Sequence, residues 1–213
     1  LTTSTLNRVM VVELALPALL PGALVGLHYA VQILRPRLGY GSDVGGRRTP
    51  WIIGGIATLG LGAVLAALAI ALLDDHRLGG IALAIVAFVL IGVGVGAAGT
   101  SLLVLLAKRV DERRRAAAAT VVWLMMIAGF VVTTVVVGKL LDPYSAPRLL
   151  ALTAAVAVVA LLVTLVAVHG LERPDATAPA APAGADPAAA KPRFREALAQ
   201  VWDEPQARRF TIF

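Results

Sequence analysis

The sequence has 213 residues, of which 59% are apolar and only 15% are charged, and its mean hydropathy is +0.85. Soluble domains are roughly 45–50% apolar and about 25% charged, so this composition excludes an ordinary soluble enzyme. The absence of Cys excludes disulfide bonds and thiolate metal sites. The net charge of +6 does not predict nucleic-acid binding, because the basic residues lie at the ends of apolar blocks.

Residues 1–13 predict the end of a first transmembrane helix, followed by an outer loop. Five apolar blocks come next, and each reaches the length of about 20 residues that a bilayer-spanning helix needs. Strands are ruled out, since open sheet edges cannot face lipid. We therefore expect an all-α membrane protein, with Pro17 and Pro21 kinking its first complete span. The predicted spans are Leu14–Leu34, Trp51–Leu73, Ile81–Ala107, Ala116–Gly138 and Leu149–Val168.

The basic residues are divided unequally between the two sides of this predicted bundle. Four Lys and Arg lie in Arg35–Pro50, five in Lys108–Arg115 and six after Val168, which is 15 of the 19 in the chain. These three segments fall on one side when five spans alternate across a bilayer. By the positive-inside rule, that side is cytoplasmic.

The segment after the last span is of a different kind. Residues 173–192 are rich in Ala and Pro and predict a disordered central loop. Phe194, Leu198, Val201 and Trp202 recur at helical spacing, which predicts an amphipathic cytoplasmic helix over residues 193–209. This helix either lies on the membrane surface or packs on the protein's own loops. Residues 210–213 are expected to begin a seventh transmembrane helix.

The connector between the first two complete spans carries a recognisable motif. It consists of Gly39, Asp43, Gly46, Arg47 and Arg48 in the run GYGSDVGGRR. The glycines allow tight turns and close helix approach, and the Asp carboxylate can pair with an Arg as two halves of a bundle rock. The motif resembles the cytoplasmic loop between helices two and three of the major facilitator superfamily. It departs from that loop at Val44, where the family usually has a basic residue. The resemblance implies a major facilitator-type bundle, here the N-terminal half of a 12-helix protein.

Three longer stretches are more specific, namely Leu6–Leu14, Arg37–Ile52 and Val201–Phe213. Together they resemble the PucC/LhaA family, the bacteriochlorophyll delivery branch of that superfamily. The resemblance implies an assembly factor for light-harvesting complexes in the bacterial inner, intracytoplasmic photosynthetic membrane. Bacteriochlorophyll would be its bound cargo. Its expected partners are antenna polypeptides, membrane lipids and bacteriochlorophyll synthase, with no nucleic acid.

Two other functions stay open at this point. One is a secondary transporter of a small solute, and the other is an accessory subunit of bacteriochlorophyll synthase. Ion-coupled carriers keep ionisable groups inside their bundles at considerable cost. The last four predicted spans contain no Asp, Glu, Lys, Arg or His, and Leu90 stands where the superfamily often has an Arg. This composition favours an apolar or amphiphilic cargo over proton coupling.

His28 is the histidine that lies within a predicted span. A neutral imidazole can ligate the magnesium of a bacteriochlorophyll, so His28 is a candidate pigment-binding residue. The alternative is a hydrogen bond to a neighbouring helix. Asn7, Arg8 and Glu13 form a second polar group at the outer end, where Arg8 and Glu13 are expected to form an ion pair. The alternative for these three is a polar gate or a contact with a pigment ring.

Gly92, Gly96 and Gly99 are expected to serve helix packing, since small residues at this spacing let two backbones approach closely. The sequence contains no nucleophile beside a base, no phosphate-binding loop and no metal-ligand cluster, so we predict neither a catalytic nor a metal site. The expected protein is not an enzyme.

Overall fold

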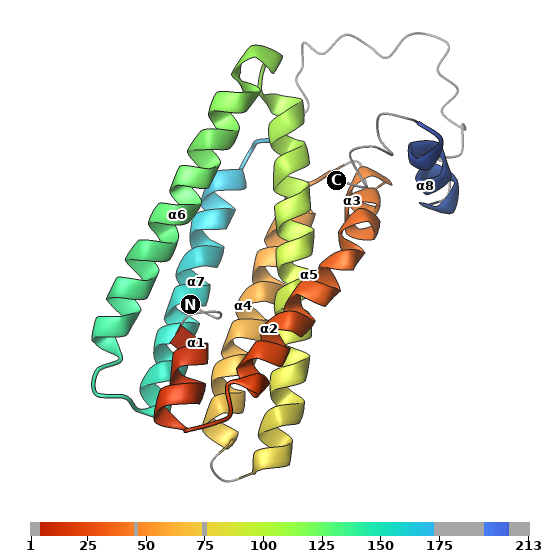
Figure 1. Ribbon diagram of the computed structural model, residues 1–213. Coiled ribbons are helices and arrows are strands. Elements are labelled where there is room, and N and C mark those ends of the chain that lie inside the picture. The colour runs from red at the N-terminus through yellow and green to blue at the C-terminus, as the bar shows by residue number, and fades with distance from the viewer. Residues whose placement is uncertain (1–4, 45–46, 74–75, 173–193, 205–213) are drawn as a thin grey trace, which may run out of the picture.

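The structure is a computed structural model that describes residues 5–44, 47–73, 76–172 and 194–204. These residues form an all-α membrane protein, and no strand occurs in the described ranges. The long helices run side by side (Figure 1). The α-helices are α1 (Thr5–Arg8), α2 (Leu19–Val31), α3 (Arg35–Val44), α4 (Thr49–Leu72), α5 (Arg77–Arg109), α6 (Arg115–Leu140), α7 (Ala146–Val168) and α8 (Phe194–Asp203).

Within the described residues, four helices are long and apolar enough to cross a membrane: α4, α5, α6 with its preceding turn, and α7. In lipid the backbone must satisfy its own hydrogen bonds, and a long apolar segment does so as a helix. Proline stands in the first turns of α4 and α7, where its missing N–H removes no helical bond. These helices agree in place with the last four spans that the sequence predicted.

The fifth predicted span, Leu14–Leu34, has different bounds in the structure. The chain forms a π-helix over Val9–Glu13, leaves helical geometry, and begins α2 only at Leu19. Pro17 lies in this break, and Pro21 lies in the first turn of α2, so neither kinks the helix interior. The helix then passes through a 3₁₀ turn, Gln32–Leu34, into α3. Helix therefore continues through the first part of the predicted connector, Arg35–Pro50, as far as Val44.

The packed core lies between α4 and α5 and is extended by α1, α2 and α7. It contains many alanines, which bring the helices close, and its largest buried side chain is Phe88, which is 2% exposed. A Cβ built on Gly55 would lie 2.6 Å from the backbone nitrogen of Ala98, and one on Gly94 would lie 2.6 Å from the carbonyl oxygen of Gly55. Small residues at these contacts let the backbones of α4 and α5 approach closely.

The helices α6 and α7 bury few of their own side chains. Only Val137 of α6 is buried, and Met125 and Trp123 are 69% and 61% exposed. A helix that is apolar on all sides cannot face water, so these surfaces face lipid or further protein. This exposure agrees with the membrane character of the fold.

Charge is arranged by position along the bundle. Helix α3, residues 47–48 and the connector between α5 and α6 lie at one end of the bundle, at the top in Figure 1, and we call this the basic end. The π-helix and the connector between α6 and α7 lie at the opposite end. Two of the three basic segments predicted on the cytoplasmic side, Arg35–Pro50 and Lys108–Arg115, therefore lie at the same end of the bundle.

The last described element is α8, which lies beside α3 (Figure 1). The rings of Tyr40 and Phe194 meet edge to face with centroids 5.4 Å apart. Leu198 and Trp202 are 48% and 50% exposed. One end of the apolar face therefore contacts the protein's own helix, while Leu198 and Trp202 stay about half exposed. The predicted central loop, 173–192, and the predicted start of helix seven, 210–213, lie outside the described residues.

Candidate functional site

The residues of the loop motif meet at the basic end of the bundle. Asp43 is near the end of α3 and Arg48 directly precedes α4, so a short connector brings them together. The guanidinium of Arg48 donates a hydrogen bond to the carboxylate of Asp43 and forms an ion pair with it. The Arg48 side chain is only 5% exposed, whereas that of Asp43 is 54% exposed. A buried cation thus has a partner that water can reach.

A second carboxylate, Glu172, binds the start of α4 from the far end of α7. The N–H of Arg48 donates to both of its oxygens at 2.7 and 2.9 Å, and the N–H of Thr49 donates at 2.8 Å. Arg48, the residue before α4, makes no side-chain cap of its own. The carboxylate of Glu172 therefore satisfies free N–H groups at a helix start, where negative charge is also favoured by the helix dipole.

The surroundings of Glu172 act on its acidity in two directions. Burial favours the neutral acid and acts to raise the pKa. The hydrogen bonds from Thr49 and Arg48, together with the charge of Arg47, favour the carboxylate and outweigh burial, so the pKa of Glu172 is lower than its ordinary value. Glu172 is therefore an ionised cap at neutral pH.

Two glycines of α3, the motif residue Gly39 and the nearby Gly41, serve close packing of this helix. A Cβ on Gly39 would lie 3.0 Å from the side chain of Thr100 on α5, and a Cβ on Gly41 would lie 2.7 Å from the indole of Trp51 on α4. The hydroxyl of Ser42 donates to the carbonyl of Gly39 at 2.7 Å. Arg47 is exposed, and Gly46 lies outside the described residues. Gly39 and Gly41 therefore allow α3 to lie against both neighbouring helices, α5 and α4.

His28 faces a packed environment. It lies on α2, is 7% exposed, and its ring meets Tyr29 edge to face at 5.0 Å. Its Nδ1 is buried and has no hydrogen-bond partner among the described residues. Gln32, in the 3₁₀ turn that follows α2, donates from Nε2 to the carbonyl of Gly92 on α5 at 3.3 Å. Neither pigment ligation nor a hydrogen bond to a neighbouring helix is tested by this arrangement of His28.

Two of the three packing glycines on α5 lie against the preceding helices. A Cβ on Gly92 would lie 2.8 Å from Val31, and a Cβ on Gly96 would lie 3.1 Å from Leu38. A Cβ on Gly99 would meet nothing within 4 Å. The close contact continues from Gly96 to Thr100, which is opposite Gly39, because residues four apart share one face of a helix.

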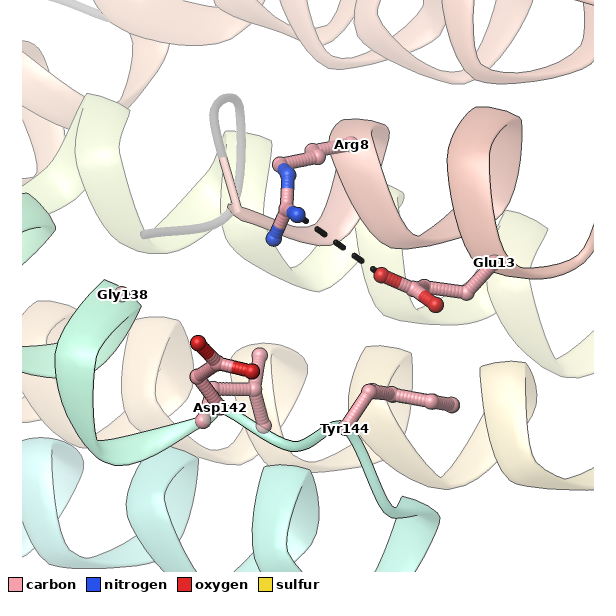
Figure 2. A pocket seen from close by; sticks show the side chains of 6 residues that line it. Arg8, Glu13, Gly138, Asp142 and Tyr144 are labelled. Atoms are coloured by element: carbon pink, nitrogen blue, oxygen red, sulfur yellow. Dashed lines mark ion pairs between the residues drawn. The ribbon is translucent and has the colours of Figure 1, made fainter.

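The polar group at the opposite end lines a cavity of about 270 Å³. Arg8 and Glu13 form the expected ion pair, with 3.7 Å between guanidinium and carboxylate. Asp142, from the connector between α6 and α7, points its carboxylate toward the same space, and Tyr144 lines it further along (Figure 2). Asn7 does not line this cavity, and its Oδ1 is buried without a hydrogen-bond partner in the described structure. The cavity lining thus has two acidic side chains, Glu13 and Asp142, and one basic side chain, Arg8.

Sequence reasoning missed Glu172 and Asp142. Glu172 lies 124 residues from Arg48 in the chain, and the one available signal was a carboxylate just after a span whose end is otherwise basic. Asp142 follows a predicted span directly and could have been placed at the outer end with Glu13. Among the residues that the structure describes, no group of three His, Cys, Asp or Glu is placed to hold a metal ion.

The comparisons with known proteins agree with the membrane fold. The family model "PUCC protein" matches residues 5–213. A Rhodobacter capsulatus protein named "Bacteriochlorophyll synthase 44.5 kDa chain" is 54% identical over 219 aligned residues, which cover 100% of this chain and 48% of that protein. "Protein PucC" of Cereibacter sphaeroides is 28% identical and is matched by 81% of the chain, and "Protein PucC" of Rhodobacter capsulatus is 30% identical and is matched by 70%.

The chain spans about half the length, or less, of these curated relatives. No solved structure matches it. The family model matches nearly the whole chain, including all the helices described above. The chain is therefore a multi-pass membrane protein that belongs to the PucC family.

Proposed function

We propose that the protein is an assembly factor for photosynthetic light-harvesting complexes that binds bacteriochlorophyll and delivers it to antenna polypeptides. The observation that carries the proposal is the match over the whole chain to a relative whose name contains bacteriochlorophyll. Its place would be the photosynthetic inner membrane, with the basic end in the cytoplasm. It would act as the N-terminal part of a major facilitator-type, 12-helix protein.

The character of the helices supports an amphiphilic cargo. Between their ends, α4, α5, α6 and α7 carry no ionisable side chain. Proton-coupled carriers place such groups inside the bundle. The apolar helices suit a pigment that enters from the lipid, and they give no chemistry for a reaction. We therefore propose a binding function and not catalysis.

His28 belongs to this proposal as a candidate ligand to the magnesium of the pigment. Its Nδ1 has no partner among the described residues, which leaves the imidazole unassigned. The side chain is only 7% exposed, so α2 would have to move away from α5 before a pigment ring could reach it. His28→Leu should then change the absorption spectrum of bound pigment, whereas His28→Leu without spectral change would remove this residue from the proposal.

The decisive experiment is an absorption spectrum of the purified protein, together with antenna levels in a deletion strain. Bound bacteriochlorophyll and reduced antenna are expected. Normal antenna complexes in the deletion strain would overturn the proposal. Substrate flux in proteoliposomes that an uncoupler abolishes would favour a secondary transporter instead.

One relative's name favours a second candidate, an accessory subunit of bacteriochlorophyll synthase. This candidate predicts that the synthase copurifies with the protein and that bacteriochlorophyllide accumulates unesterified in the deletion strain. Normal esterification with reduced antenna would exclude it and retain the first proposal.

A further inference from the structure

A groove at the basic end lies between α3, α4 and α5 and has a volume of about 300 Å³. Its wall on α4 is formed by Trp51, Gly54, Gly55 and Thr58, which share one face of that helix. The span from Trp51 to Thr58 is roughly 10 Å of helix axis. Leu38 on α3 and Gly94 on α5 close the other sides.

The groove is lined by apolar side chains and glycines, and the one hydroxyl in its lining already has a hydrogen-bond partner. The Thr58 hydroxyl donates to the carbonyl of Gly54 at 2.8 Å. Gly54 is exposed, and a Cβ built on it would meet nothing within 4 Å. The groove runs along α4, a helix long and apolar enough to cross a membrane, so a flexible aliphatic chain from the lipid phase could enter it. At this volume it has room for part of a chain but is at the lower limit of sites for compact ligands, about 300–1,000 Å³.

The charges beside the groove indicate the head group of that occupant. Arg37 precedes the lining residue Leu38, and Arg47 lies shortly before the lining residue Pro50. Both arginines are exposed, and Arg37 has no ion pair among the described residues. Arg48 pairs with Asp43 and the charge of Arg47 acts on Glu172, whereas Arg35 binds the Gln32 side chain. The four arginines of α3 and the α3–α4 connector thus exceed these two carboxylates by two positive charges among the described residues.

We propose that this groove binds an acidic phospholipid, with one acyl chain along α4 beside Trp51 and the phosphate beside Arg37 and Arg47. Basic pockets between transmembrane helices at the cytoplasmic side bind anionic head groups in this way. The inference goes beyond the proposed pigment function and does not depend on it.

The test uses the quenching of Trp51 fluorescence by brominated acyl chains. The sequence has three tryptophans, and Trp123→Phe with Trp202→Phe leaves Trp51 alone. In nanodiscs, brominated phosphatidylglycerol should quench Trp51 more strongly than the same mole fraction of brominated phosphatidylcholine. The matched control retains only Trp123, which is 61% exposed on α6 and should be quenched equally by both lipids. Equal quenching of Trp51 by both lipids would overturn the proposal.

Substitutions in the groove separate the chain from the head group. Gly54→Leu should fill the groove and abolish the preference for phosphatidylglycerol, whereas Gly129→Leu on α6, where a Cβ also meets nothing within 4 Å, should leave it unchanged. Arg37→Gln should reduce the preference about five-fold, the factor for one arginine near an anionic surface. A preference for phosphatidylglycerol that survives Gly54→Leu would show that the groove is not the phospholipid site.

Discussion

The ion pair between Asp43 and Arg48 leads to a prediction about stability. Asp43→Asn removes one negative charge but keeps the shape of the side chain and one acceptor oxygen. The Arg48 side chain, at 5% exposure, would then be a buried cation without a carboxylate, and its Nε already has no partner among the described residues. We expect the variant to be less stable because the charge of Arg48 has to remain in a site that excludes water.

The magnitude follows from the unequal exposure of the two groups. Removing one partner of a fully buried pair costs about 3–5 kcal/mol, whereas an exposed pair contributes about 0–1 kcal/mol. Asp43 is 54% exposed, so water can replace part of its effect. We expect Asp43→Asn to lower the free energy of unfolding by about 2 kcal/mol, between these two limits.

The assay is thermal or denaturant unfolding of the purified protein in detergent, followed by tryptophan fluorescence. Arg47→Gln is the matched control, since Arg47 is exposed and should change stability by no more than about 0.5 kcal/mol. In the double variant Asp43→Asn, Arg48→Met, removal of the stranded charge should restore part of the loss. Wild-type stability of Asp43→Asn, or a double variant whose loss equals the sum of the two single losses, would refute the reasoning.

Three further predictions concern other contacts. Glu172→Gln should lower the free energy of unfolding by about 1 kcal/mol at neutral pH. Because the pKa of Glu172 is lowered in the folded protein, the stabilisation by its carboxylate is complete above the ordinary pKa of about 4.3. This stabilisation is lost as the pH falls through the folded pKa. Unfolding curves of this variant and wild type should therefore converge in acid, and a difference that stays constant down to pH ~3 would contradict the cap. Gly55→Ala should lower stability by about 1–3 kcal/mol through overpacking against α5. Gly54→Ala should raise stability by up to about 1 kcal/mol, because its Cβ would meet nothing within 4 Å and Ala favours helix over Gly. Equal melting temperatures of the two variants would contradict this contrast. Arg8→Gln should cost less than about 1 kcal/mol, because the Arg8 side chain is 61% exposed, and a double-variant cycle with Glu13→Gln would measure the pair.

Much of the fold could be predicted from the apolar blocks. The predicted span Trp51–Leu73 corresponds to α4, Thr49–Leu72, and the later spans agree similarly with α5, α6 and α7. The exception is the first complete span, because prolines and a 3₁₀ turn divide a segment that is apolar throughout. Hydropathy reports burial in lipid, and it does not report where the backbone leaves helical geometry.

The candidate site could be predicted only in part. The motif predicted that Asp43 pairs with an Arg across the bundle, which stays a prediction; in the structure the partner of Asp43 is Arg48, five residues further along the chain. The expected close packing holds for Gly92 and Gly96, but Gly99 meets open space, because the contact face of α5 continues through Thr100. Gly41 was not singled out by the motif, although it lies against Trp51.

The sequence by itself determined that this protein is a bundle of membrane-crossing helices with its arginine-rich connectors at one end. Lipid offers the backbone no hydrogen bonds, so a long apolar segment has to be helical whatever surrounds it. Only the tertiary structure decided that Glu172, at the end of α7, caps the start of α4, and that α3, α4 and α5 enclose a groove. Those features depend on which helix faces meet, and that choice is made by the fit of side chains far apart in the chain.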